Sequence, residues 1–473
     1  MKKRNFKKYN FLKIKKVISI YNRSKFYVEQ LFLLFLLSAI PLLLSELIIF
    51  NPYSSTRLDS PLTNNVSSTQ VYQLQWNVTW GNENDTYITG MAADSNNYIY
   101  ICGYTKNTPG GIEDIFLRKF DTNGNLIWNK IWHNPQMDYS YDIIIDKNDN
   151  IYICGTSYIN LTNLYDGIII KYNTNGQNLM NITWGGANSQ YVTSMDIDDN
   201  GNIYATGYDS GGSNNMIFVR KMTNTGSLLW EKTWDMAGND ISHFIKIVGN
   251  SVYVLAQTDS IGAGNIDALL LKYDTDGYLI WNTTWGGSYI EYVYDLKFDK
   301  DNYGYILGST TSFTLGSFDI YLTKFNSAGN FLWNRTWGDI TGDYGFDMCI
   351  IDDLIYVAGS TYSYGAGSSD FLFMIWDTSG NQPWHTYWGW NGKDSGNEIV
   401  YINGDIYIAG KTTSFGTGEY DGILAKLSKP ITTTTTIPGF NLQLVFASTI
   451  LLIIIVKIIG FQFKNKRLKI FSE

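Results

Sequence analysis

The chain has 473 residues, with 44 glycines, 35 tyrosines, 24 phenylalanines and 15 tryptophans but only 8 prolines, 3 cysteines and 3 histidines. A composition so rich in glycine and aromatic residues favours β-structure with many turns. His133, His243 and His385 are too few and too far apart in sequence to suggest most metal or nucleophile sites that are built on histidine.

The net charge of −8 is unevenly distributed along the chain. Residues 1–30 carry ten Lys/Arg and one Glu, residues 457–473 carry five and one, and residues 71–427 carry 18 Lys/Arg against 39 Asp/Glu. A strongly acidic surface repels polyphosphate, so the middle of the chain is not expected to bind nucleic acid. Cations and cationic partners remain compatible with it.

Two apolar runs lie next to the basic ends, at residues 31–50 and 440–461. Each approaches the roughly 20 residues that span a bilayer, so we predict two transmembrane helices. The flanking Lys and Arg predict that residues 1–30 and 462–473 are cytoplasmic tails at a cell membrane. The first run is either a signal anchor or a signal peptide, because Pro41 and Glu46 interrupt it. In both cases the acidic middle is predicted to lie on the extracytoplasmic face, after a linker at 51–70.

Residues 71–427 contain a tryptophan that recurs every 50 to 52 residues. We call these the repeat tryptophans: Trp80, Trp132, Trp184, Trp234, Trp285, Trp337 and Trp388. A fixed period of this length is typical of repeat architectures. Another Trp stands four residues earlier in every repeat except one, where Met180 replaces it.

Each repeat contains four short β-rich runs, as at 141–146, 150–156, 166–172 and 177–184. The first and third gaps are tight turns rich in Asn, Asp and Gly, and the second and fourth are longer. Four antiparallel strands per repeat predict an all-β fold, a seven-bladed β-propeller with four-stranded blades.

The last repeat stops after its third strand, at 421–427, and the missing fourth strand is found at the other end of the propeller region, at 71–80. We therefore predict that strand 71–80 pairs into the last blade and closes the ring. Such closure removes two open sheet edges at once.

The repeats resemble the SBBP β-propeller repeat family, whose core reads D-x-x-G-N-x-Y-x-x-G. This core stands here as DDNGNIYATG (198–207), DKNDNIYICG (146–155) and DSNNYIYICG (94–103). The resemblance covers nearly all of 71–427 and implies the propeller fold. It implies little about activity, because such repeats serve as scaffolds on exported proteins with varied roles.

A Thr-rich linker, 428–439, follows the propeller. Its Thr tract is typical of an extended spacer that can carry O-linked glycans. Pro438, Gly439 and Phe440, followed by the second apolar run and a basic tail, resemble the PGF signal of archaeal surface proteins. That resemblance implies removal of the tail and lipid attachment, and a plain stop-transfer anchor is the alternative.

Several residues are candidates for sites. The sixth residue after the repeat tryptophan is acidic in five repeats: Asp138, Asp240, Glu291, Asp343 and Asp394. This pattern predicts a partial acidic ring at one mouth of the propeller's channel, where the carboxylates could hold calcium. Thr86 and Gln190 take that position in the other two.

The segment 196–201 has oxygen ligands at alternate positions but lacks the bidentate Glu of a calcium loop, so an ordinary Asx turn is favoured. Cys102, Cys154 and Cys349 are predicted to be free thiols.

Four sequons share one position on the fourth strand, and they are predicted glycosylation sites: Asn77, Asn181, Asn282 and Asn334. Alternation along a strand places these amides opposite the tryptophans, which can then pack between blades.

The long connections form one face of the predicted propeller, and they are rich in Gly, Ser and aromatic residues. We predict that this long-loop face binds an extracellular protein, glycan or other ligand through Phe313, Tyr362, Tyr364 and Phe415. A structural envelope or adhesion module without a defined ligand is the alternative. A quinoprotein-like propeller enzyme is disfavoured because the repeats leave no inserted catalytic domain.

Overall fold

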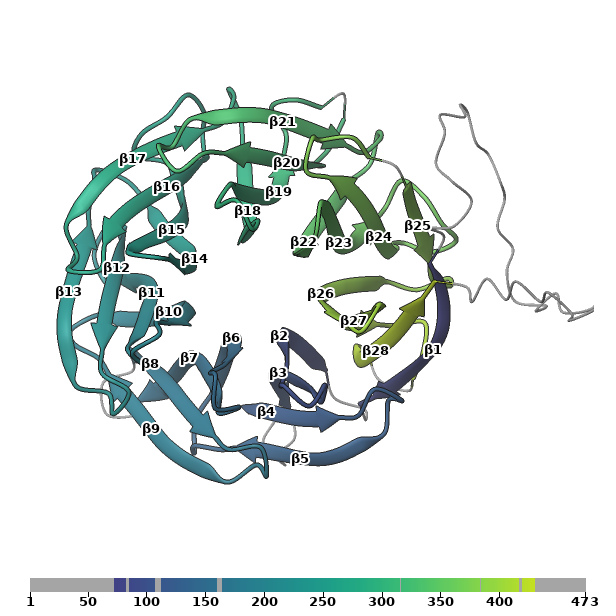
Figure 1. Cartoon of the computed structure of the whole chain (residues 1–473), viewed down its shortest axis with the longest axis horizontal. Helices are drawn as coiled ribbons and strands as arrows, with labels where there is room; N and C mark the ends of the chain where they lie inside the picture. Colours follow the sequence, from purple (N-terminus) through teal and green to yellow (C-terminus); the bar gives the residue numbers. More distant parts are fainter. Residues whose placement is uncertain are drawn as a thin grey trace, which may run out of the picture. The chain divides into compact units, whose positions relative to one another are not determined.

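The computed structural model describes residues 72–81, 85–106, 112–159, 164–314, 316–382, 384–416 and 419–429. Their 28 strands form seven four-stranded antiparallel sheets. The sheets are arranged as blades around a central channel (Figure 1). The predicted seven-bladed propeller is confirmed.

The first four blades follow the chain in order. Blade 1 contains β2 (Thr86–Ala93), β3 (Ile99–Lys106), β4 (Glu113–Phe120) and β5 (Leu126–Trp132). Blade 2 contains β6 (Asp138–Ile145), β7 (Ile151–Ile159), β8 (Leu164–Tyr172) and β9 (Asn178–Trp184). Blade 3 contains β10 (Ser189–Ile197), β11 (Ile203–Ser210), β12 (Asn215–Met222) and β13 (Leu228–Trp234). Blade 4 contains β14 (Asp240–Val248), β15 (Ser251–Thr258), β16 (Asp267–Asp274) and β17 (Leu279–Trp285).

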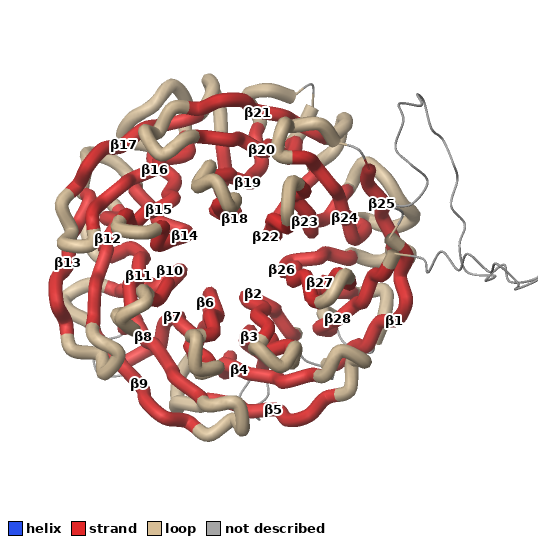
Figure 2. The backbone as a smooth tube through the Cα atoms, viewed as in Figure 1, coloured by secondary structure: helices blue, strands red, loops and turns tan. Residues whose placement is uncertain are grey.

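Blade 5 contains β18 (Glu291–Phe298), β19 (Gly304–Thr310), β20 (Asp319–Phe325) and β21 (Phe331–Trp337). Blade 6 contains β22 (Asp343–Ile351), β23 (Leu354–Thr361), β24 (Asp370–Asp377) and β25 (Trp384–Trp388). Blade 7 contains β26 (Asp394–Ile402), β27 (Asp405–Thr412), β28 (Asp421–Ser428) and β1 (Gln73–Trp80). The described chain is strand, turn and loop throughout (Figure 2).

Blade 7 is built from both ends of the described chain. β1 pairs antiparallel with β28, and the register places Trp80 opposite Gly422 and Val78 opposite Leu424. The predicted closure of the ring by the N-terminal strand is therefore confirmed.

The hydrophobic core lies between neighbouring blades. Trp76 and Trp80 of β1 pack on a cluster that joins blade 7 to blade 1, including Leu424, Ile101 and Phe116. Strand alternation explains this, because residues two apart share one face of a sheet. The predicted packing of the tryptophans between blades is confirmed.

The tight turns use the chemistry that their sequences predict. In the turn after β6, Asp146 Oδ1 accepts the backbone N–H groups of Asn148 at 2.8 Å and Asn150 at 2.9 Å. Asp149 adopts a left-handed conformation with φ of 60°. Asp198 makes the same Asx turn with Asn200 and Asn202, as predicted for segment 196–201.

One part of the predicted fold class is wrong: the described structure contains no helix, so it is an all-β propeller without the two flanking helices that we expected. Among the described residues, no helix is long and apolar enough to cross a membrane. Within the described residues, the alternation of apolar and polar side chains favours strands. The predicted spans 31–50 and 440–461 lie outside the described residues, as do the terminal tails, the linker 51–70 and almost all of the Thr-rich linker.

Candidate functional site

The first strand of each blade lies innermost in the ring: β2, β6, β10, β14, β18, β22 and β26 (Figure 1). We call the region around the ring axis, between these strands, the central channel. Each of these strands has a β-bulge near its third residue, for example between Ser140 and Asp142 and between Gly345 and Asp347. A bulge twists an edge strand and redirects its side chains. The bulges therefore redirect side chains at the same height along the inner strand of every blade.

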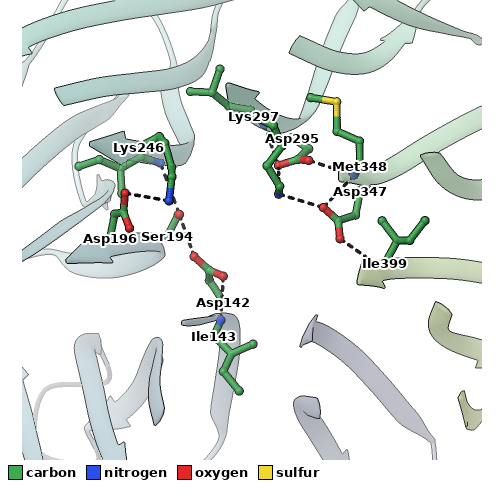
Figure 3. Close-up of polar contacts among 12 residues, drawn as sticks. Asp142, Ile143, Ser194, Asp196, Lys246, Asp295, Lys297, Asp347, Met348 and Ile399 are labelled. Carbon is green, nitrogen blue, oxygen red and sulfur yellow. Dashed lines mark hydrogen bonds and ion pairs between the residues drawn. The ribbon is translucent and has the colours of Figure 1, made fainter. Parts of the chain in front are cut away.

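At this level, carboxylates of one blade accept backbone N–H groups of the next (Figure 3). Asp295 Oδ2 accepts the N–H of Met348 at 3.0 Å, and Asp142 Oδ2 accepts the hydroxyl of Ser194 at 2.8 Å. We call Asp142, Asp295, Asp347 and Glu398 the channel carboxylates. Asp142, Asp295 and Asp347 satisfy donors on the exposed edge of the neighbouring inner strand, which would otherwise lack a partner within a sheet.

Lys297 supplies a positive charge to this level of the channel. Its Nζ lies 2.8 Å from Asp295 Oδ1 and 3.1 Å from Asp347 Oδ1. Burial opposes its charge, but the two carboxylates outweigh burial and raise the pKa of Lys297. Burial, with the nearby Asp347 and Asp142, raises the pKa of Glu398 well above its usual value. Asp295 and Asp347 thus share one ammonium group between blades 5 and 6.

A pocket of about 390 Å³ lies at the tight-turn end of the channel, against blades 1 to 4. Its two lysines already have partners: Lys147 Nζ donates to the carbonyl of Asp199 at 2.6 Å, and Lys246 Nζ lies 3.0 Å from Asp196 Oδ2. These contacts leave the pocket with little free charge for an anionic ligand.

The five acidic residues predicted to form a rim are fully buried, each at the first position of an inner strand: Asp138, Asp240, Glu291, Asp343 and Asp394. Their carboxylates bind groups of nearby loops. Asp343 Oδ2, for instance, accepts the N–H of Asp339 at 3.0 Å and the hydroxyl of Ser363 at 2.7 Å. Gln190 takes the equivalent position in blade 3, because it stands two residues before the bulge at Val192, as Asp138 stands two residues before the bulge at Ser140.

These five residues come from five different blades, and the structure does not gather them into one metal site. Within the described part of the chain, no group of three or more His, Cys, Asp or Glu side chains is placed to hold a metal ion. The single shared ring that we predicted as a calcium site therefore remains a prediction without direct structural support.

The long-loop end of the channel carries a continuous series of tyrosine rings across blades 7, 1, 2 and 3. Ring centroids of neighbours lie 4.7 to 6.2 Å apart along this series, which we call the tyrosine arc: Tyr420, Tyr87, Tyr104, Tyr139, Tyr165, Tyr191 and Tyr208. All seven side chains are half-buried. Burial raises the pKa of Tyr104 and of Tyr208 to about 12, so both phenols stay neutral at physiological pH.

A second aromatic group lies at the same end on blades 5 and 6. Tyr292 stacks on Phe318 at 5.2 Å, Phe318 lies 5.8 Å from Tyr344, and Tyr344 lies 6.1 Å from Tyr362. Lys411 of blade 7 lies over Tyr87 and Tyr420, 5.4 and 5.1 Å from their ring centroids. Aromatic surface therefore extends over most of this channel mouth.

The four aromatic residues predicted to bind a ligand all lie in long loops, but the structure does not bring them together. Phe313 and Tyr362 are exposed, at 47% and 46%. Tyr364 packs on Trp337 at 5.5 Å and Phe415 on Trp390 at 6.2 Å, and both are half-buried. Each of the four covers its own part of the face.

The remaining predicted residues are placed as follows. Asn181, Asn282 and Asn334 are exposed on outermost strands and Asn77 is half-buried, and their glycosylation remains a prediction. All three cysteines are free, with Cys102 and Cys154 buried and Cys349 half-buried. Burial raises the pKa of the Cys102 thiol.

Sequence reasoning missed the tyrosine arc and the channel carboxylates, although both follow the repeat. The seventh residue after the repeat tryptophan is tyrosine at 87, 139, 191, 292 and 344. The tenth is acidic at 142, 295, 347 and 398. Counting from the tryptophan would have found the channel carboxylates and three tyrosines of the arc, Tyr87, Tyr139 and Tyr191, but not Tyr104, Tyr165, Tyr208 and Tyr420.

Comparison with protein families agrees with this architecture. Residues 79–111 and 134–162 match SBBP, a beta-propeller repeat. The chain carries SBBP repeats. The resemblance predicted from the turn sequences is confirmed for these segments.

More distant likenesses concern the fold. The uncharacterized WD repeat-containing protein L264 of Acanthamoeba polyphaga mimivirus is 25% identical over 181 residues, which cover 30% of this chain and only 13% of the viral protein. The Neurospora crassa Pan2 WD40 domain superposes with a TM-score of 0.50 at 10% identity, covering 78% of this chain and 98% of the domain. The Pseudomonas aeruginosa periplasmic gluconolactonase PpgL reaches 0.46 at 11% identity, covering 73% and 100%.

These similarities support the fold assignment alone, and no activity of this chain is inferred from them. The fold of the chain is a seven-bladed β-propeller.

Proposed function

We propose that this propeller is a binding module that recognises a partner protein through its long-loop face, around the mouth of the channel. The tyrosine arc is the observation that carries the proposal. Tyrosine offers a large, rigid contact area with a polar hydroxyl at its tip, and it is enriched at the centres of protein interfaces.

Exposed apolar side chains support the same face. The long loops expose seven large apolar residues, which are Met137, Met236, Tyr289, Phe313, Ile340, Tyr362 and Trp390. The tight turns expose two among the described residues, Tyr278 and Tyr303. Ten further exposed large apolar residues lie on the outermost strands of the described blades, so the long-loop face exceeds the tight-turn face in exposed apolar groups only where loops and turns are compared. Apolar groups gathered in neighbouring loops favour a site of association.

The tight-turn face has a different character. Its turns are dominated by Asp and Asn residues whose side chains already bond to the backbone of the same turn, as Asp146 does with Asn148 and Asn150. Groups that are occupied in this way contribute less to a new interface. An extracytoplasmic location for the module remains a prediction from the sequence.

Site-specific photo-crosslinking in cells that make the protein tests this proposal. A crosslinker in place of Tyr289 or Tyr362 should capture one and the same protein, while a crosslinker in place of Tyr303 should not. Capture from Tyr303 alone would contradict the proposal. Capture of glycan material alone from Tyr289 and Tyr362 would replace the partner protein by a glycan, and no capture would favour a structural module.

A further inference from the structure

Pairs of buried carboxylates lie at the boundaries between successive blades. Between blades 4 and 5, a Cβ atom built on Gly286 would lie 1.7 Å from Asp267 Oδ1 and 2.4 Å from Glu291 Oε2. The two oxygens therefore converge on one point. Asp267 is 1% exposed and Glu291 is fully buried.

The same arrangement recurs between blades 6 and 7. A Cβ atom on Gly389 would lie 2.1 Å from Asp370 Oδ1 and 2.7 Å from Asp394 Oδ2. Glycine leaves room for the carboxylates at both positions, because a Cβ atom would require them to shift. The glycine directly follows the repeat tryptophan in five of the seven repeats, and His133 and Asp235 take this position in the other two.

A third pair lies between blades 5 and 6. A Cβ atom built on Gly338 would lie 2.2 Å from Asp319 Oδ1. Asp343 opens the next blade and is fully buried. The backbone N–H of Asp343 donates to the carbonyl of Phe318, the residue before Asp319, at 2.7 Å, so Asp319 and Asp343 are neighbours across this boundary. Burial, followed by the charge of Asp343, raises the pKa of Asp319 to about 6. Three boundaries in succession thus hold two carboxylates each.

Several oxygens of these pairs are buried without a hydrogen-bond partner: Asp267 Oδ1, Asp319 Oδ1, Asp343 Oδ1 and Asp370 Oδ1. The opposite oxygens are held in place. Gly264 N donates to Asp267 Oδ2 at 2.9 Å, and Thr310 Oγ1 donates to Glu291 Oε1 at 2.8 Å. Carboxylates that are fixed, buried and adjacent carry a large electrostatic cost unless a positive group joins them.

The boundary between blades 1 and 2 provides an internal comparison. There the glycine position is His133, and its Nδ1 lies 2.6 Å from Asp114 Oδ1. Asp138 is the second carboxylate of this boundary. The hydrogen bond and charge of Asp114 raise the pKa of His133 and favour its cationic form. Here the chain itself supplies a positive group beside the carboxylates.

We propose that three carboxylate pairs each bind a calcium ion: Asp267/Glu291, Asp319/Asp343 and Asp370/Asp394. In each pair the ion takes the role that the cationic side chain of His133 has at the boundary between blades 1 and 2. Calcium accepts oxygen ligands in flexible geometry, and backbone carbonyls and water complete such shells. A site with two protein carboxylates belongs to the weak class, with dissociation constants near 10⁻⁴ to 10⁻³ M, which suits extracellular calcium.

Calcium titration of the full-length protein tests the proposal. Calorimetry should find three weak sites, and Tb³⁺ should give luminescence sensitised by Trp285 and Trp388, which directly precede Gly286 and Gly389 in sequence. Calcium should also raise the melting temperature, because it binds only the folded ring. Glu291→Gln and Asp394→Asn should each remove one site, while Asp199→Asn, a change of an exposed turn carboxylate, should remove none.

His133→Gly supplies a test that does not depend on the loss of a carboxylate. It should create a fourth site at Asp114 and Asp138 and remove the cation that the chain supplies there. Unchanged stoichiometry in Glu291→Gln, Asp394→Asn and His133→Gly would overturn the proposal. So would the absence of binding and of a melting shift up to about 10 mM calcium, well above the range of weak extracellular sites.

Discussion

Asp347 Oδ2 accepts the backbone N–H of Ile399 at 2.8 Å, across the boundary between blades 6 and 7. Inner strands of a propeller have one edge that no strand of their own blade can pair. A carboxylate from the preceding blade satisfies a donor on that edge, so the channel side of the ring is held by side chains while the outer parts are held by apolar packing.

Asp347→Ala should therefore lower the free energy of unfolding by about 2 kcal/mol, because a hydrogen bond to a charged group is lost and a buried donor is left without its acceptor. Urea unfolding followed by tryptophan fluorescence measures the change. Asp353→Asn is the control, since its carboxylate is 75% exposed and should shift the midpoint little. Equal midpoints for both variants would show that the channel carboxylates do not stabilise the ring.

Trp80→Ala should weaken the contact between blade 7 and blade 1 that closes the ring, and so lower the free energy of unfolding. Trp80 of β1 lies 5.2 Å from Phe120 of blade 1, and Arg118 lies over its ring at 5.2 Å, so its side chain joins blade 7 to blade 1. We expect a loss of about 3 kcal/mol, the lower end for replacing a core Trp by Ala, because Trp80 is half-buried. Trp390→Ala removes an indole that is 55% exposed and should leave the urea midpoint close to that of the parent protein.

Stability should fall as pH rises from about 4 to 7, in part because of Asp138. Burial raises the pKa of Asp138 to about 7, against about 3.9 for an unfolded chain. The folded state keeps this proton in a range where the unfolded state releases it, so the free energy of unfolding decreases as pH increases. In Asp138→Asn the urea midpoint should decrease less between pH 4.5 and 7 than in the parent. Parallel pH profiles would refute the assignment.

Cys102 and Cys154 should resist alkylation in the folded protein. Both side chains are fully buried, and burial raises the pKa of each thiol, so little thiolate forms and reagents cannot reach it. Mass spectrometry after iodoacetamide treatment should find both unmodified in buffer and modified in urea. Ser213→Cys, at an exposed loop position, provides a thiol that should react in both conditions. Rapid labelling of Cys154 in buffer would mean that blade 2 opens readily.

The sequence predicted the blades well because the signals were local or repeated. The repeat tryptophans set the period, Asp146 and its neighbours set the tight turns, and the missing fourth strand set the closure. The site was harder to predict, because it depends on the contacts between blades. Asp138 and Glu291 look like exposed rim residues in a strand pattern, but loops fold over them and bury them completely. Tyr104 and Tyr139 belong to different repeats and meet only in the ring.

The β-bulges could not be predicted from alternation. An extra residue in each inner strand, such as the one between Ser140 and Asp142, shifts the register and turns the later side chains toward the neighbouring blade. Strand alternation alone would therefore assign Asp142 to the wrong surface. Its bond to Ser194 of the next blade becomes visible only in three dimensions.

The affinity of the purified full-length protein for the partner captured from its long-loop face tests the central claim most directly. Tyr289→Ala, Tyr362→Ala and Trp390→Ala together should raise the dissociation constant at least about 100-fold, because exposed aromatic residues of this kind dominate protein interfaces. The matched double variant Tyr278→Ala and Tyr303→Ala, on the tight-turn face, should bind as the parent does. Full affinity in the triple variant, with loss in the double variant, would contradict the long-loop face as the binding surface.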